Sequence, residues 1–467
     1  MNLRAIANKL NAGAYELTEG LFLRLLGLTY LCAFGSLWPQ ILGLSGSQGV
    51  APAVNLMTAM RAQLGARAYF YTPSLLWLNS SDHALTFLCG AGCICGMLLL
   101  TGLFSRWMAA ACFVLYLSIV TVGPPFMSFQ WDALLLEAGF LALFAGAPWL
   151  VWTYRLLLFR LMFESGLVKL TSGDPNWRNL HALRFHFMTQ PLPNPLAYYM
   201  YRAPNWLLDS LTALTLAIEL VAPFLLFFPR KWRIGGVAAL MFLQVCVLLT
   251  GNYAFFNLLA LALCLWGLDD ATFAPLGRLL RRRFPSSNGP RWKPVLRAMN
   301  AALAIMAFFG VLELLGRAPV FLQPFEIVNG YGLFAMMTTD RPEIVLEGSE
   351  DQVNWKEYSF RYKPGNLHRG LPLVAPYQPR LDWQMWFAAL GRYEGNSWVG
   401  SLMYRLLRGD AAVTELLNPP PFPKPPRYMR ALLYQYDFTT PAERARSGAV
   451  WQRRLLGTWF GPVALKR

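Results

Sequence analysis

The sequence predicts a multipass α-helical membrane domain of about nine crossings, followed by a C-terminal extracytoplasmic α+β domain with a β-sheet core. Of the 467 residues, 55% are hydrophobic and 14% are charged, and the mean hydropathy is +0.36. Apolar runs of about 20 residues, long enough to cross a ~30 Å hydrocarbon layer, recur through the first two thirds of the chain. They end near residue 316, so we expect a membrane domain over 1–316 and a second domain over 317–467.

Nine apolar runs are expected to cross the membrane, and a polar N-terminal stretch, residues 1–20, is expected to lie at the interface as a short amphipathic helix. The runs cover residues 21–44, 84–104, 107–123, 131–152, 154–171, 206–228, 232–250, 253–268 and 294–316. The net charge of +16 does not form a basic face or tail, because the cations gather at the ends of these runs. This pattern predicts a lipid bilayer as partner and no nucleic acid.

The cation-bearing loops also predict the orientation. Cations precede the first run and follow the second, fourth, sixth ("RKWR", 230–233) and eighth ("RLLRRRF", 278–284) runs. All of these loops fall on one side if the N-terminus is cytoplasmic, as the positive-inside rule requires. An odd number of crossings then puts the C-terminal domain on the opposite side. The fifth run is the most polar, and we expect neighbouring helices to shield its charges.

In the last 150 residues the long apolar runs stop, and charged residues are spread through the sequence. Alternating aromatic residues in "NWKEYSFRY" and "LLYQYDF" predict strands, whereas "LDWQMWFAAL" and "SWVGSLMYRLL" have helical spacing, the second with Ser397 as a candidate N-cap. The proline-rich "NPPPFPKPP", residues 418–426, should be an extended connector.

Motifs for metals, nucleotides and nucleophilic catalysis are missing from the sequence. The four histidines form no metal-binding pattern, and no Walker A loop, dinucleotide fingerprint or GxSxG elbow is present. All seven cysteines lie in apolar runs, and "CGAGCIC" (residues 89–95) is best explained as small residues packing a membrane helix. We therefore expect no cofactor and no metal.

Five charged residues in or beside the fourth and fifth runs are the candidates for structural ion pairs: Asp132, Glu137, Arg160, Glu164 and Lys169. Arg160 and Glu164 are spaced i,i+4 and can pair on one helix face. Glu137 needs a partner, and we expect Lys169 to provide it. A second interpretation makes Lys169 a desolvated base, with Glu137 or Glu164 tuning it, in a membrane-embedded active site. The aromatic loop after Thr171 suits either lipid headgroups or another protein.

Three long motifs resemble one known family. "QWDALLLEAGFLALF", "FESGLVKLTSGDPNWRNLHALRFHFMTQPLPNP" and, in the second domain, "EYSFRYKPG" followed by "PYQPRLDWQMWFAAL" are similar to the lipase maturation factor family over residues 20–460. The resemblance implies a multipass membrane protein, in animals of the endoplasmic reticulum, that helps secreted lipases reach their active form. It also implies that the C-terminal domain lies on the luminal side.

A shorter segment is similar to the membrane domain of vitamin K-dependent carboxylases. There a "GxxKL…W" pattern carries a lysine proposed as the active-site base, and here it matches Gly166, Lys169, Leu170 and Trp177. Two features differ from what the resemblance to the lipase maturation factor family implies. The second domain contains no cysteine, and the chain ends "VALKR", without a KDEL-type retrieval signal. On these grounds the sequence favours a bacterial inner membrane over the endoplasmic reticulum membrane.

Three hypotheses about function follow. The first is a membrane-anchored folding factor that holds a secreted client, possibly a lipase, through the exposed members of six residues: Arg361, Lys363, Arg380, Asp382, Trp383 and Trp386. The two tryptophans are spaced i,i+3 and would equally serve as core. The second is a membrane enzyme with Lys169 as base and a lipid-soluble or peptide substrate. The third is a structural scaffold in a larger membrane assembly.

Overall fold

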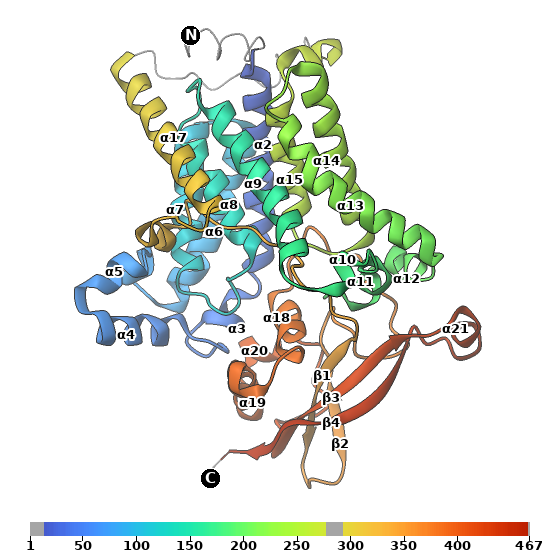
Figure 1. Ribbon diagram of the computed structural model, residues 1–467. Coiled ribbons are helices and arrows are strands. Elements are labelled where there is room, and N and C mark those ends of the chain that lie inside the picture. Colours follow the sequence, from blue (N-terminus) through green and yellow to red (C-terminus); the bar gives the residue numbers. More distant parts are fainter. Residues whose placement is uncertain (1–13, 277–292, 466–467) are drawn as a thin grey trace.

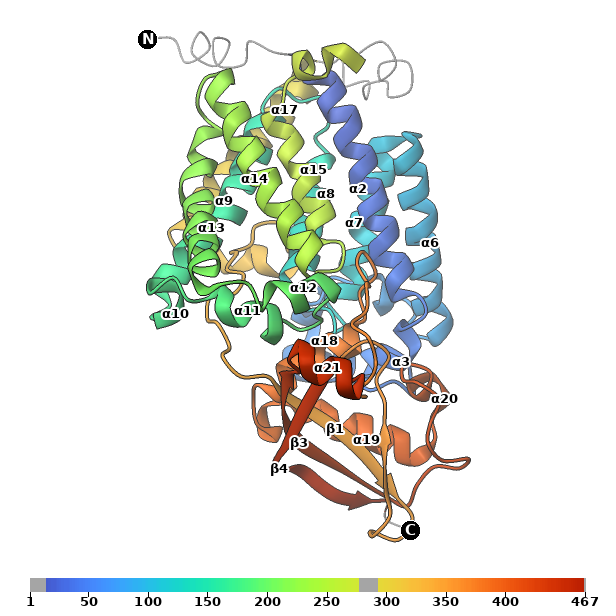
Figure 2. The ribbon, with the colours of Figure 1, turned by 90° about the vertical axis from the view of Figure 1, so that its right-hand side faces the viewer.

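A bundle of long helices stands on a smaller domain built around one antiparallel sheet (Figure 1). The computed structural model describes residues 14–276 and 293–465. The interfacial helix expected near the N-terminus and the arginine-rich loop after residue 277 fall mainly outside these ranges. The chain enters the bundle at the end remote from the sheet, and both views place the sheet beyond the opposite end (Figure 2).

The nine predicted crossing segments each contain a helix. These helices are α2 (Glu16–Leu37), α6 (Asp82–Thr101), α7 (Ser105–Val120), α8 (Gln130–Ala142), α9 (Leu150–Thr171), α13 (Asn205–Leu225), α14 (Arg230–Thr250), α15 (Phe256–Cys264) and α17 (Lys293–Leu314). Among the described residues, five helices are long and apolar enough to cross a membrane, namely α2, α6, α13, α14 and α17. The chain is thus an integral membrane protein, while the count of nine crossings stays a prediction.

Shorter elements connect these helices, and most lie at the end of the bundle that faces the sheet (Figure 1). They are α3 (Ile41–Ser45), α4 (Ala53–Leu64), η1 (Gly65–Arg67), α5 (Ala68–Tyr71), η2 (Leu75–Trp77), α10 (Pro175–Arg178), α11 (Leu183–Thr189), α12 (Pro195–Met200), η3 (Leu265–Gly267), η4 (Asp270–Leu276) and η5 (Val320–Phe325). The aromatic loop after Thr171 becomes α10, α11 and α12. Its Met188 and Tyr198 pack against Tyr436 and Trp451 of the sheet domain. This loop therefore receives the chain's own C-terminal domain.

Close packing of small residues joins α2 and α6. A Cβ on Gly27 would lie 2.4 Å from the backbone nitrogen of Leu100, and one on Gly92 would lie 2.4 Å from the Phe34 ring. Such contacts are possible only because glycine has no side chain, so the helix backbones approach closely. The interpretation of the "CGAGCIC" segment as a packing face is confirmed.

The sheet domain has strand order β2-β1-β3-β4, with every neighbouring pair antiparallel. Its elements are β1 (Pro342–Ser349), β2 (Trp355–Tyr358), α18 (Arg380–Ala389), η6 (Tyr393–Gly395), α19 (Trp398–Arg408), α20 (Ala411–Thr414), β3 (Tyr428–Phe438), α21 (Pro441–Ser447) and β4 (Trp451–Ala464). The two predicted helices are confirmed, and so is the strand over "LLYQYDF", which ends β3. The strand expected over "NWKEYSFRY" is confirmed only at residues 355–358, because Phe360 makes just an isolated bridge to Leu417, and β1 and β4 were not predicted. Ser397 occupies the N-cap position of α19, yet its side chain makes no capping hydrogen bond, contrary to expectation.

Candidate functional site

Helix α9 places three buried cations in the middle of the bundle. It is 22 residues long, which gives it a length of about 33 Å. Arg155, Arg160 and Lys169 are each at most 3% exposed. Buried charge is costly unless it is paired, so the partners of these cations decide what the helix can do.

Arg160 pairs with two glutamates. Its Nη1 lies 2.7 Å from Glu137, and its Nε lies 3.7 Å from Glu164 one turn along α9. The Glu137 carboxylate also accepts the backbone N–H of Asn329 and the hydroxyl of Tyr331, at 3.0 and 2.8 Å. Because these last two residues belong to the segment between α17 and the sheet, the cluster fixes that segment against the bundle.

Lys169 pairs with a different residue, Glu219 on α13. Its Nζ donates to both carboxylate oxygens at 2.8 Å and to the Ser165 carbonyl at 3.1 Å. The Trp177 ring stands 5.2 Å from the same nitrogen. An ammonium group has three protons, so these three acceptors satisfy it completely.

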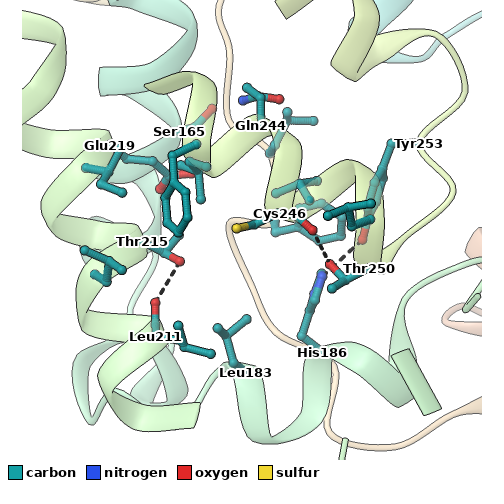
Figure 3. Close-up of a pocket in the computed structure, with 18 of the residues that line it drawn as sticks. Ser165, Leu183, His186, Leu211, Thr215, Glu219, Gln244, Cys246, Thr250 and Tyr253 are labelled. Atoms are coloured by element: carbon teal, nitrogen blue, oxygen red, sulfur yellow. Dashed lines mark hydrogen bonds between the residues drawn. The ribbon is translucent and has the colours of Figure 1, made fainter. Parts of the chain in front are cut away.

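The ion pair lies in the wall of a pocket bounded by α9, α11, α12, α13 and α14 (Figure 3). Its volume is about 370 Å³, within the usual range for small-molecule sites. The lining is mostly apolar, and the polar side chains in it include His186, Gln244 and Tyr253. The His186 ring projects from α11 toward Tyr253 and Thr250 (Figure 3).

These positions correct the predicted catalytic cluster. Glu137 and Glu164 do not line the pocket and are held by Arg160, whereas Lys169 lines it and is held by Glu219. The expected Glu137–Lys169 pair is wrong: Arg160 contacts Glu137, and Lys169 follows Arg160 by nine residues on α9, which is about 14 Å along the helix axis. A general base needs a free lone pair, so this geometry gives the enzyme interpretation no support. The Arg160–Glu164 pair is confirmed.

Asp132 forms the ion pair that joins the two domains. Both Nη atoms of Arg380, at the start of α18, contact its carboxylate, at 2.8 and 2.9 Å. Arg380 is fully buried and also donates to the carbonyl of Phe126 and the hydroxyl of Tyr116. The fork of a guanidinium suits such bidentate binding, which fixes the position as well as the charge.

A second buried arginine ties the sheet to the aromatic loop. Arg341, just before β1, donates to the carbonyls of Met188, Gln190 and Pro191 at 2.5–2.8 Å. Its charge is balanced by Glu343 at 2.8 Å, which also binds Lys363 at 2.8 Å. The domain is thus held at two independent polar points, and the side chains at both are buried.

The predicted client-binding residues are mostly buried, which corrects that expectation. Lys363, Arg380, Asp382, Trp383 and Trp386 are each at most 8% exposed. They cannot touch a client at the surface, because they hold the domain together or join it to the bundle. Only Arg361 of the six is exposed.

The two tryptophans fill the contact between the domains rather than the centre of the sheet domain alone. The Trp383 ring packs edge-on to Trp131, with centroids 4.8 Å apart. Trp386 donates its indole N–H to the Thr189 carbonyl at 2.9 Å. Their predicted alternative role as core residues is confirmed, and the core extends into the bundle.

Two important residues of the pocket were not predicted, Glu219 and His186. Glu219 could have been found, because it is the only carboxylate between residues 210 and 268 and a lone charge in an apolar run needs a partner. His186 gave no comparable signal. Only the fold brings it opposite Tyr253, with the Nε2 and hydroxyl 3.1 Å apart.

The fold and its buried contacts define a multipass membrane protein. Its C-terminal sheet domain is held against one end of the helix bundle by buried polar contacts. Residues 17–275 match the family model for the lipase maturation factor transmembrane domain, and residues 327–461 match the model for the lipase maturation factor C-terminal domain. The chain therefore belongs to the lipase maturation factor family.

Curated relatives match over nearly the whole chain. Lipase maturation factor 1 of Bos taurus is 36% identical, with 99% of this chain and 92% of the relative covered. The Homo sapiens lipase maturation factor 1 is 35% identical, covering 98% and 89%. Lipase maturation factor 2 of Gallus gallus is 33% identical, covering 93% and 79%. No solved structure gives a significant match.

Proposed function

We propose that this protein is a membrane-anchored maturation factor that helps secreted lipases reach their active form. The observation that carries the proposal is the similarity to lipase maturation factors, which includes both the bundle and the sheet domain. The packing supports it, because a domain fixed at Arg341 and Arg380 presents its outer surface in one orientation to the space beyond the membrane.

The sheet domain lies on the extracytoplasmic side in this proposal. The loops that bear cations meet at the other end of the bundle: Arg106 donates to the Ala145 carbonyl, and Arg233 pairs with Asp269 at 3.0 Å. Leu17, at the start of α2, donates its N–H to Asp270 at the same end. The positive-inside rule then makes that end cytoplasmic.

The endoplasmic reticulum is the compartment that the relatives favour. Those compared come from animals, and they give the bacterial inner membrane suggested by the sequence no support. In the endoplasmic reticulum the sheet domain would face the lumen, where secreted proteins fold.

We place the client contact on strand β4. It is the 14-residue edge of the sheet and pairs only with β3. Its Leu455 and Leu456 are 52% and 46% exposed. An edge strand offers unpaired backbone groups to an extended segment of another chain, and exposed leucines favour an apolar segment. Arg361, three residues after the other edge strand β2, remains a second candidate contact.

Secretion of active lipase tests the proposal. In cells that lack their own maturation factor, the wild-type chain should restore secreted lipase activity. Leu455→Lys combined with Leu456→Lys should lower that activity several-fold without changing expression, since both side chains are exposed. Val353→Lys is the control, because Val353 is 76% exposed between β1 and β2.

Two outcomes would count against the proposal and are distinguishable. Failure of the wild-type chain to restore any lipase activity, at normal expression, contradicts the function itself. Full activity of the double lysine variant contradicts only the assignment of β4 as the client contact.

A further inference from the structure

The pocket beside Lys169 is placed to receive a molecule from the membrane. Two of its walls are α13 and α14, which are long and apolar enough to span. Four lining side chains, Leu196, Leu214, Phe242 and Leu249, are 41–56% exposed, so the pocket reaches the outer surface of the bundle. A ligand that arrives there comes from a lipid environment, and the apolar lining suits a hydrocarbon chain.

The polar groups of the lining decide which end group the pocket accepts. Lys169 uses all three of its protons on Glu219 and Ser165. Thr215 and Thr250 donate to carbonyls of their own helices at 2.8 Å. Further donors are engaged as well: Ser165 with Leu161, Trp177 with Phe334, Gln244 with Met162, and Tyr253 with Gln190. The Gln244 amide keeps a second N–H, but the other polar side chains named here offer a carboxylate or phosphate no free N–H or O–H donor. One neutral N–H does not offset the cost of burying an anion.

His186 offers the opposite kind of group, a free acceptor. The Gln190 amide donates to the Thr250 carbonyl, which leaves its Oε1 to accept the Tyr253 hydroxyl proton at 2.7 Å. The Tyr253 oxygen must then accept from His186 Nε2, 3.1 Å away. In a neutral imidazole the other nitrogen, Nδ1, is an acceptor. Within residues 14–276 and 293–465, no hydrogen-bond donor reaches it.

We infer that this pocket binds an uncharged single-chain lipid whose polar end carries a hydroxyl group, as in a long-chain alcohol or a monoacylglycerol. The chain lies along the apolar wall between α13 and α14, and the hydroxyl donates to His186 Nδ1. The Lys169–Glu219 pair closes the polar end and does not attract an anion, because its charges cancel. This binding site is independent of the proposed client contact on β4.

Photolabelling of the purified full-length protein in nanodiscs tests the inference. The probe is a monoacylglycerol with a photoreactive diazirine in its chain, and the labelled peptides are identified by mass spectrometry. We expect labelling of α13 and α14. Unlabelled long-chain alcohol should compete about three- to tenfold better than its methyl ether, the effect of one neutral hydrogen bond. The fatty acid, ionised at pH 8, should compete no better than the ether.

Variants separate this pocket from general contact with lipid. Thr215→Trp and, from the facing helix, Cys246→Trp fill the pocket and should each lower labelling at least severalfold. Val221→Trp is the control, because Val221 is on α13, 61% exposed and outside the lining. His186→Phe should keep labelling but lose the preference for alcohol over ether.

Equal labelling of the wild type and of a folded pocket-filling variant would overturn the binding site. Equal competition by alcohol, ether and fatty acid in the wild type would overturn the assignment of the end group. Thermal unfolding of each variant identifies those that are folded, and two filling variants from different helices ensure that one misfolded protein does not decide the result.

Discussion

At the scale of single residues, the buried charged side chains of this protein hold its helices and its two domains together. Arg160, Lys169 and Arg380 each have carboxylate partners and carbonyl acceptors. Helical spacing alone predicted the Arg160–Glu164 pair, because both residues share one helix. It could not predict the Lys169–Glu219 or Asp132–Arg380 pairs, because those partners come from helices far apart in the sequence.

His186 is the residue from which we expect a pH dependence. Burial, reinforced by the nearby charge of Lys169, lowers the pKa of His186 from 6.5 to about 4. Between pH 6.5 and 4 the His186 imidazole is protonated in the unfolded chain and neutral in the folded chain. The stability that the neutral ring contributes is therefore complete above pH 6.5 and is lost as the pH falls toward 4.

The expected size of this loss is on the order of 2 kcal/mol between pH 7.5 and 4.5. Thermal unfolding of the detergent-purified protein over this range measures it, with His186→Phe as the comparison. The variant should lose less stability on acidification than the wild type. Identical pH profiles would show that His186 titrates normally in the folded protein.

At the scale of elements, hydropathy located the helices well, while the sheet was only half predicted. Strand β3 alternates aromatic side chains, which is why it was found. Strand β1 is buried along nearly all of its length and so has no alternation to detect. Strand β4 breaks its alternation because its register against β3 shifts at several points. Those shifts depend on the partner strand and leave no periodic signal in the sequence.

The α2–α6 contact gives a prediction at this scale. Gly27→Val should destabilise the protein by about 1–3 kcal/mol or more, because the new side chain would meet the α6 backbone. Gly35→Val on the same helix is the matched control, since a Cβ there has nothing within 4 Å. Chemical or thermal unfolding measures the difference. Equal effects of the two substitutions would mean that the helices can separate at little cost.

At the scale of the whole molecule, the two domains behave as one body because their contact is closed by buried polar groups. Replacing Arg380 by Met leaves Asp132 buried without a cation and should cost about 3–5 kcal/mol. The double variant, Arg380→Met with Asp132→Leu, removes both charges and should be much more stable than the single one.

A double-mutant cycle, read by thermal unfolding, measures this coupling. Arg361→Met is the control, because that side chain is exposed and makes one carbonyl contact, to Leu417. Additive effects of the Arg380 and Asp132 substitutions would contradict the coupling.

The Asp132–Arg380 pair also has a consequence for biosynthesis. The carboxylate belongs to α8 and its cation is contributed almost 250 residues later, so α8 is made well before its charge can be neutralised. A chain that stops between Leu314 and Arg380 keeps all the described long helices of the bundle yet carries an uncompensated buried anion. Late truncations should therefore weaken the helix bundle itself, so that an incomplete C-terminus is detectable as a defect in the bundle.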